Sequence, residues 1–334
     1  MPGDLPQAAA VRLSQAIDAL EAQRRRAAEA TVVICGQIVV LALVWGVAPI
    51  ARGHWSPGGI FTAAAAMLGA RFLLGLSENL WRSTANRIVV PILAETLGGM
   101  TARLRSRGPA LDLLPAIGAL LDPDVLFDLD PAFELGLLPR RSANWADWRL
   151  DGEHRSLAFT MAAIVQRWNT AGNKPASRRS DHVLLSIVVP VPFQGRVLIA
   201  RDGGVFEAIA DHLTPLLDTV LSRPDSPQRL QAPYEAFERR FTVRADDPAE
   251  AQRLVIAAVA EGLVAIDEAH PDRSVRAAFH RGRLWLALDL AEPMLQQVSL
   301  LRPAPAMMAQ LQEMLGELGL PHRLIDYLHG RPPA

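Results

Sequence analysis

The run of apolar residues over positions 31–51 contains no charged side chain and only Gln37 as a strongly polar one. In an α-helix such a run is long enough to cross the hydrocarbon core of a bilayer, which is about 30 Å thick. A helix that is apolar on all sides must be buried on all sides, so soluble chains rarely contain one. The pattern predicts a membrane span near residues 30–51; the alternative is a core helix of a soluble domain.

A second apolar stretch follows the turn-forming sequence RGHWSPGG, which occupies residues 52–59. This stretch includes Arg71, which would cost about 2.5–3.5 kcal/mol at the centre of a bilayer. Arg71 lies close to the end of the stretch at Leu76, however, so its long side chain can reach the nearer interface. We therefore expect a second span near residues 59–77, and hence a transmembrane hairpin over residues 30–80.

Residues 1–29 precede this hairpin and are predicted to form a cytoplasmic amphipathic helix. Their apolar side chains recur at helical spacing, as at Leu13, Ile17 and Leu20. Basic residues lie on both sides of the hairpin, at Arg24–Arg26 before it and at Arg82 and Arg87 after it. Because positive charge favours the cytoplasmic side, both ends and the main domain are expected in the cytoplasm. If the second stretch did not span, the main domain would face the other way.

Residues 81–122 are predicted to form connecting helices. An apolar stripe indicates a helix from about Asn86 to Arg107, kinked or restarted at Pro91, and a shorter helix follows over residues 111–121. The next stretch, DPDVLFDLDPAFE, spaces its aspartates in a way that invites comparison with a calcium loop. The EF-hand pattern fails because its glycine and its terminal glutamate are missing, so we interpret the aspartates as capping and turn residues.

Residues 123–334 alternate between strand and helix patterns, which predicts a soluble mixed α+β domain. Apolar and β-branched residues predict strands near Trp145 and over residues 157–165, 183–191 and 196–200. A helix is expected over residues 205–221, and the polar sequence over residues 169–181 is typical of a flexible loop. The predicted fold class is α+β, with an N-terminal amphipathic helix and a two-span hairpin before the soluble domain.

A strong helix signal lies in the middle of this domain. Asp247 is a favourable N-cap, Pro248 suits the first helical position and Glu250 completes a capping box. In a capping box the glutamate side chain returns to the backbone N–H of the N-cap residue. We expect the helix to continue without a break to His270.

The remaining elements of the domain are predicted from alternation and periodicity. Two alternating segments joined by Arg281-Gly282 predict a β-hairpin. A last helix over residues 307–318 carries a methionine-rich stripe, for which packing against the sheet is the ordinary reason. Gly319 and Pro321 are expected to end that helix.

Composition excludes several classes of function. The net charge is -1 and the estimated pI is 6.7, so no nucleic-acid partner is expected. Cys35 is the only cysteine, which excludes an internal disulfide and a cysteine zinc cluster. The apolar run starts too far into the chain, and is too long, for a cleaved signal peptide.

Two segments of the chain carry a resemblance to a known family. FERRFTVRADDPAEAQRLVIAAVAEGL at residues 237–263 and VRAAFHRGRLWLALDL at residues 275–290 resemble the bacterial membrane proteins grouped as domain of unknown function 3137. Phe193-Gln194-Gly195 matches the family's Phe-x-Gly element, and Asp246-Asp247 matches its acidic lead into a helix. The match departs at Leu230-Gln231-Ala232, where the family has acidic residues.

The resemblance implies placement and fold, because the family has no assigned reaction and no catalytic residues. Its members show a charged N-terminal helix, two closely spaced spans and a soluble α+β domain, in the order predicted here. A further departure is Gln252-Arg253, which stands where the family usually has an Arg-Tyr pair. The implied location is the bacterial inner membrane.

No strong catalytic motif is present. The chain has no nucleophile elbow, phosphate-binding loop, dinucleotide fingerprint or HExxH sequence. His154 lies beside Asp151 and Glu153, but on a strand those two carboxylates share the face opposite to His154. We therefore assign no catalytic, cofactor-binding or metal-ligating residue, and we expect no cofactor.

Two classes of function remain for the main domain. The favoured one is a binding or scaffold module at the inner membrane, with the lipid bilayer and a protein of unknown identity as partners. The alternative is a membrane-tethered enzyme whose site combines residues far apart in sequence. The candidate interaction edge comprises Phe193, Gly195 and Arg196, because neighbouring prolines predict an unpaired strand that a partner can extend.

Overall fold

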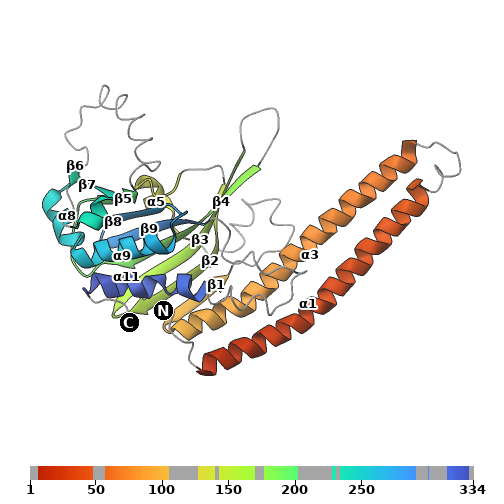
Figure 1. Ribbon diagram of the computed structural model, residues 1–334, viewed down its shortest axis with the longest axis horizontal. Coiled ribbons are helices and arrows are strands. Elements are labelled where there is room, and N and C mark those ends of the chain that lie inside the picture. Colours follow the sequence, from red (N-terminus) through yellow and green to blue (C-terminus); the bar gives the residue numbers. More distant parts are fainter. Residues whose placement is uncertain are drawn as a thin grey trace. The chain divides into compact units, whose positions relative to one another are not determined.

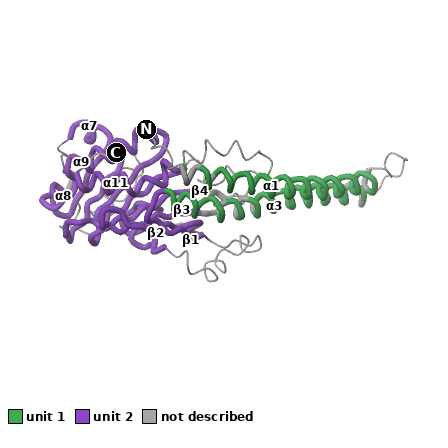
Figure 2. Tube along the Cα trace, turned by 90° about the horizontal axis from the view of Figure 1, so that it is seen from below, with its two compact units in different colours: residues 1–96, 106–118, 295–314 green, residues 97–105, 119–294, 315–334 purple. Residues whose placement is uncertain are grey.

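The computed structural model describes residues 7–47, 57–104, 127–139, 143–169, 177–201, 228–230, 234–290, 300 and 314–330. The chain divides into two compact units, which Figure 2 distinguishes by colour. Unit 1 comprises Met1–Thr96, Ser106–Gly118 and Leu295–Met314, and unit 2 comprises Leu97–Arg105, Ala119–Met294 and Leu315–Ala334.

Unit 1 begins with one long helix where the sequence predicted two elements. α1 (Gln7–Ala42) joins the amphipathic segment to the apolar run and continues into the π-helical turn η1 (Leu43–Val47). Over Ser14–Trp45 it is the one helix among the described residues that is long and apolar enough to cross a membrane. Only 11% of its most apolar window is buried, a small share for a core helix of a soluble domain.

The second helix of unit 1, α3 (Pro57–Leu97), runs antiparallel to α1 (Figure 1). Near the start of α1, Arg12 forms an ion pair of 3.1 Å with Glu95, close to the end of α3. Further along α1, the Cys35 thiol donates to the Ala70 carbonyl at 3.5 Å, nearer the start of α3. The second predicted span lies within α3, but the structure does not show it as a separate span.

α3 also corrects the prediction of connecting helices. The helix passes through Pro91 without a break and ends at Leu97, so no helix runs from Asn86 to Arg107. Gly98 and Gly99 follow with φ angles of 76° and 66°, a conformation that glycine adopts without strain. These glycines turn the chain into a strand of the sheet, β1 (Met100–Leu104), inside the region that was predicted to connect domains.

Unit 2 is built on a nine-stranded sheet whose neighbouring strands are all antiparallel, in the order β1-β2-β3-β4-β9-β8-β5-β7-β6. Besides β1, its strands are β2 (Ala143–His154), β3 (Leu157–Asn169), β4 (Ser177–Val188), β5 (Val197–Arg201), β6 (Gln228–Leu230), β7 (Phe241–Ala245), β8 (Val275–His280) and β9 (Arg283–Leu290). β4 begins at Ser177, inside residues 169–181, so the predicted loop is shorter than expected.

The larger core lies on the face of the sheet that α9 (Ala257–Ala269) and α11 (Leu320–Leu328) cover (Figure 1). Alternate strand positions point to this face and are fully buried, as at Leu185, Leu286 and Phe279. The two helices lie close together at Gly262, where an added Cβ would come within 2.7 Å of the Tyr327 ring. Burial of these side chains holds the central strands in place.

The opposite face of the sheet, called the α5 face, carries a smaller apolar cluster. α5 (Asp130–Glu134) and the turn after it place Ala132, Leu135 and Leu137 in one cluster with Leu184 and Trp285. Phe127 meets the Trp285 ring edge-on, with ring centroids 6.2 Å apart. This cluster forms an apolar band across the α5 face, and polar side chains lie on both sides of the band.

Several local predictions are confirmed. The Asp247 carboxylate accepts hydrogen bonds from the N–H groups of Ala249 and Glu250, as an N-cap residue does. Arg281 and Gly282 have φ angles of 50° and 73°, which is the geometry of a tight turn between hairpin strands.

One predicted helix contains a break that the sequence did not indicate. The helix that starts at Asp247 breaks at Val255–Ile256, giving α8 (Pro248–Leu254) and α9, since β-branched residues are poor helix formers. The helix whose described part is residues 314–318 stops at Gly319, as predicted, and α11 begins directly after this glycine, with Pro321 in its first turn. The predicted helices over residues 111–121 and 205–221, and most of 307–318, lie outside the described residues.

Candidate functional site

The predicted interaction edge is not an unpaired strand. β4 pairs with β3 and β9, and β5 pairs with β7 and β8, so neither strand next to the edge has a free side. Phe193 is 8% exposed and meets Phe279 edge-on at 5.9 Å, so its replacement would disturb the core. The sequence argument failed because the prolines interrupt a connection between two internal strands, not the rim of the sheet.

Two carboxylates accept hydrogen bonds from backbone N–H groups of the same segment. The Glu250 carboxylate accepts from the N–H groups of Gln194 at 3.1 Å and of Gly195 at 2.7 Å, and therefore does not complete the predicted capping box. Asp246 accepts from the backbone and the guanidinium of Arg196. These bonds connect residues 193–196 to Asp246 and Glu250.

Two rows of polar side chains flank the apolar band on the α5 face. The histidine row comprises Asn144, Gln166, Ser180, His182, Asp289 and Arg276, and the arginine row comprises Arg103, Arg149, Asp151, Thr160, Ser186 and Arg283. A β-bulge between Ala146 and Trp148 allows Asn144 and Arg149 to share this face, although their spacing is odd. Both rows are therefore products of strand register.

The centre of the histidine row is a linear chain of hydrogen bonds. The Ser180 Oγ lies 3.0 Å from His182 Nε2, and His182 Nδ1 lies 2.7 Å from Asp289 Oδ1. Arg276 forms an ion pair with the same carboxylate. His182 is buried at 4% exposure, whereas Ser180 and Asp289 are partly exposed.

The charge of Asp289 determines which nitrogen of His182 donates in this series of hydrogen bonds. Burial alone would raise the pKa of Asp289, but the hydrogen bond from His182 and the charge of Arg276 hold it below its ordinary value. An ionised carboxylate only accepts hydrogen bonds, so His182 Nδ1 is the donor. In the neutral ring Nε2 then accepts from the Ser180 hydroxyl, which is the order of atoms that activates a serine nucleophile.

Sequence reasoning missed this arrangement. Ser180 and His182 are two residues apart and share a face of β4, but Asp289 is separated from His182 by 107 positions. No local motif indicates this pair, because it is the register of β4 against β9 that brings the two side chains together. The only usable signal was the alternation of polar residues within otherwise apolar strands.

A second histidine cluster joins the β2–β3 turn to α11. His154 Nε2 lies 2.9 Å from Asp326 Oδ1, and Arg155 pairs with the same carboxylate at 2.6 Å. The His322 ring stacks on His154 with centroids 4.3 Å apart, and burial lowers the pKa of His322. The prediction that Asp151 and His154 lie on opposite faces is confirmed, since Asp151 lies in the arginine row.

Metal chemistry has no support in the described part of the chain. No group of three or more histidine, cysteine, aspartate or glutamate side chains there is placed to hold a metal ion. Of the acidic stretch that was compared with a calcium loop, Asp128 accepts from the backbone N–H of Asp130 at 3.1 Å, as a turn residue does.

Among the described residues, fold and site together define an α+β domain on a nine-stranded antiparallel sheet and one candidate membrane helix. Residues 183–329, from β4 through α11, match the model of the family described as Protein of unknown function (DUF3137). This match confirms the grouping that the sequence predicted. No curated protein and no solved structure matches the chain.

Proposed function

We propose that the protein is a membrane-anchored binding module of the bacterial inner membrane, with α1 and α3 inserted as a hairpin and unit 2 in the cytoplasm. The observation that carries the proposal is the exposure of large apolar side chains on both helices. On α1 and η1 they include Val32, Val33, Val40, Leu41, Val44 and Trp45, each more than half exposed. On α3 they include Phe61, Met67, Leu68 and Phe72, with exposed fractions between 61% and 81%.

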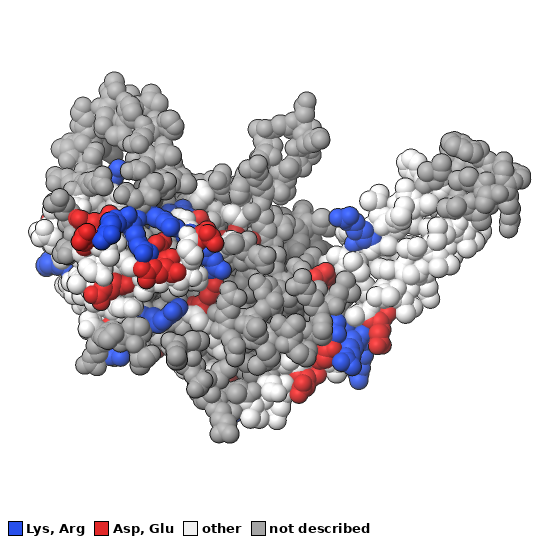
Figure 3. Space-filling model, in the orientation of Figure 1, with Lys and Arg blue, Asp and Glu red and all other residues white. Residues whose placement is uncertain are grey.

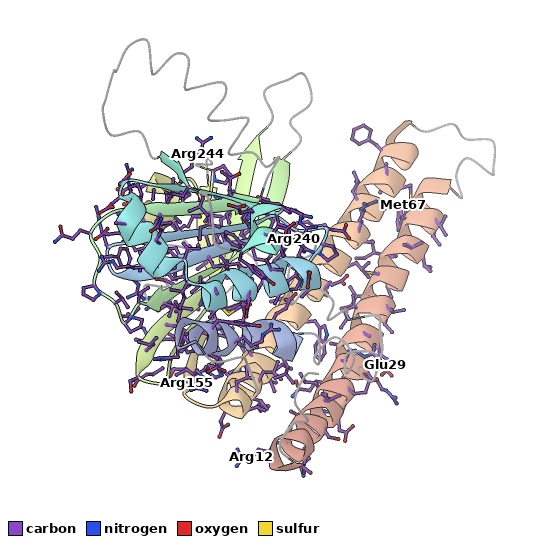
Figure 4. The ribbon with its side chains drawn as sticks, turned by 60° about the vertical axis from the view of Figure 1, so that its left-hand side comes forward. Arg12, Glu29, Met67, Arg155, Arg240 and Arg244 are labelled. Carbon is purple, nitrogen blue, oxygen red and sulfur yellow. The ribbon has the colours of Figure 1, made fainter. Side chains whose placement is uncertain are left out.

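The positions of these side chains support a two-span anchor. Because α1 and α3 are antiparallel, the exposed stretches of the two helices lie beside each other, away from the charged ends. In Figure 4, Arg12 and Glu29 lie along the lower part of the hairpin and Met67 near its upper end. The space-filling view shows mainly uncharged side chains over the described upper part, with one basic group beside them (Figure 3). Lipid is the environment that accepts such a surface.

A binding role for unit 2 is supported by the anchor itself. A domain held at a membrane has a raised effective concentration toward anything else on that surface, so weak contacts become useful there. The partner is proposed to be a protein. Crosslinking in intact membranes followed by affinity purification would identify it, and recovery of lipid alone would contradict this part of the proposal.

The anchor is tested by topology reporters fused at Ser56, in the connecting loop, and at Gly108, after the hairpin. Opposite answers are expected, with the Gly108 reporter in the cytoplasm. Two non-cytoplasmic answers would mean that α3 does not span and that unit 2 faces the other way. Two cytoplasmic answers would mean that the hairpin does not insert.

A second candidate function, acyl transfer, is favoured by the Ser180–His182–Asp289 chain. His182 would take the hydroxyl proton while Ser180 Oγ attacks an ester carbonyl and the alcohol leaves, and water would then release the acid. A fluorophosphonate probe should label Ser180 with loss of fluoride, and His182→Gln should abolish labelling. Ser186 is a matched control, since it lies on the same strand and face but bonds to Arg283. Equal labelling of the wild type and Ser180→Ala would exclude this function.

A further inference from the structure

The arginine row contains a guanidinium group without a counter-ion. Arg283 lies on β9 and is half-buried on the α5 face. Its Nε donates to Ser186 Oγ at 2.6 Å, and no carboxylate of the described residues pairs with it. A partly buried charge without a counter-ion is unfavourable, so an unpaired arginine in such a place indicates a missing anion.

The electrostatic surroundings of Arg283 agree with this geometry. Burial lowers the pKa of Arg283, and the positive charge of Arg149 lowers it further. No acidic group raises it again. The Arg149 guanidinium thus lies near enough on the same sheet face for its charge to disfavour the charged form of Arg283.

The carboxylates in and next to the arginine row are already engaged. Asp151 accepts from Arg149 at 2.7 Å and from Thr160 at 2.9 Å, and Arg103 lies 3.7 Å away. On α5, Glu134 lies 3.8 Å from Arg281. Neither carboxylate forms an ion pair with Arg283.

Charge and donors indicate the class of ligand. The row has three arginines and one aspartate, which leaves a net charge of +2. A phosphomonoester carries about −1.5 to −2 charges at pH 7 and has three acceptor oxygens. The outer nitrogens of Arg283, the Ser186 hydroxyl hydrogen and the Arg149 guanidinium are the matching donors, because arginine binds phosphate through paired N–H groups. The strands β2, β4 and β9 hold these donors in fixed positions.

We propose that the arginine row binds a phosphomonoester group, with Arg283 as its principal ligand and Arg149 and Ser186 as supporting donors. The site gives the binding module a ligand class, and it does not depend on which way the hairpin inserts. Both a soluble phosphate ester and the headgroup of phosphatidic acid carry this chemistry. The site is distinct from the histidine row, which lies across the apolar band on the same face.

The test uses the full chain in nanodiscs of phosphatidylcholine. Titration with glycerol 3-phosphate at constant ionic strength should raise the melting temperature of unit 2, since a ligand that binds only the folded state stabilises it. Arg283→Gln should weaken binding by about tenfold or more, and Arg283→Lys, which keeps the charge but not the fork, should weaken it less. Arg239→Gln is the matched control, because Arg239 is exposed and pairs with Glu235.

The unliganded proteins provide an independent readout. Arg283→Gln removes an unpaired charge, so its melting temperature without phosphate should equal or exceed that of the wild type. A response to phosphatidic acid nanodiscs, but not to glycerol 3-phosphate, that is lost in Arg283→Gln would identify lipid as the source of the group. Equal responses of all variants to both forms, or no response of any, would overturn the site and leave the proposed protein partner to its own test.

Discussion

The helices of unit 1 and the sheet of unit 2 both contain long apolar runs, but the runs are exposed in unit 1 and buried in unit 2. Val40 and Leu41 on α1 are 58% and 57% exposed, whereas Leu184 and Leu185 on β4 are fully buried. The difference lies in the length of the run. A strand buried on both faces needs only a few consecutive apolar residues. A helix that stays apolar over the thickness of a bilayer has more apolar surface than the other described residues bury. Run length, and not apolar content, separates the candidate membrane surface from the core.

The sharpest test of the comparison removes α1 and most of α3 from the chain. A fragment that begins near Ala85 should be soluble without detergent, because unit 2 has its own core on both faces of the sheet. Circular dichroism should show mixed helix and strand and one cooperative melt. Aggregation that only the restored hairpin relieves would show that residues 31–77 belong to the core of the fold.

Core truncation should affect only one of the two regions. Leu184→Ala removes a buried side chain from the apolar band and should lower the free energy of unfolding by about 2–5 kcal/mol. Val40→Ala, which truncates an exposed residue of α1, should leave the melting temperature of unit 2 unchanged. Thermal unfolding of both full-length variants in the same detergent provides the comparison, and similar losses would contradict it.

A newly introduced carboxylate should reduce membrane insertion when it is placed on α1, but not when it is placed on unit 2. Val40→Asp places a carboxylate in the proposed span and should cost about 2.5–3.5 kcal/mol of insertion free energy. We expect less protein in the membrane pellet after alkaline extraction. Gln252→Asp, at an exposed position on α8, is the control and should extract like the wild type. Unchanged extraction of Val40→Asp would mean that α1 does not cross the bilayer.

A smaller loss of folding stability is expected when the N-cap of a single helix in unit 2 is removed. Asp247→Ala removes the acceptor for two N–H groups of α8 and should cost about 1 kcal/mol. Glu235→Ala, which breaks an exposed ion pair with Arg239, should cost less. Chemical denaturation curves measure both, and a larger loss for Glu235→Ala would contradict the assigned cap.

The smallest effect is a gradual dependence on pH, again confined to unit 2. Burial lowers the pKa values of His270, His280 and His322 below the ordinary 6.5. Below pH 6.5 the unfolded chain takes up protons that the folded chain does not, so stability should fall as the pH falls from about 6.5 toward the lowered folded values. Asp289, with its lowered pKa, stays ionised throughout this range. Melting temperatures between pH 7.5 and 5.5 measure the slope, and His322→Asn should reduce it.

Local chemistry explains which parts of unit 2 were predictable. The Asp247 cap and the Arg281-Gly282 turn depend on residues that are neighbours in sequence, and both were confirmed. The end of α3, the break at Val255–Ile256 and the start of α11 were missed because tertiary packing overrides weak local preference. The expectation of an unpaired strand beside Phe193 was wrong for the same reason, since which strand lies at a sheet edge is not a local property.

The sequence by itself determined the apolar helix of unit 1, the α+β class of unit 2 and the family grouping, because each depends on composition, period or a contiguous segment. The tertiary structure alone decided which polar residues meet. The register of the antiparallel sheet and a bulge in β2 place His182 beside Asp289 and Arg283 near Arg149. Register is set by long-range pairing, and a shift of one residue would send every one of these side chains to the other face.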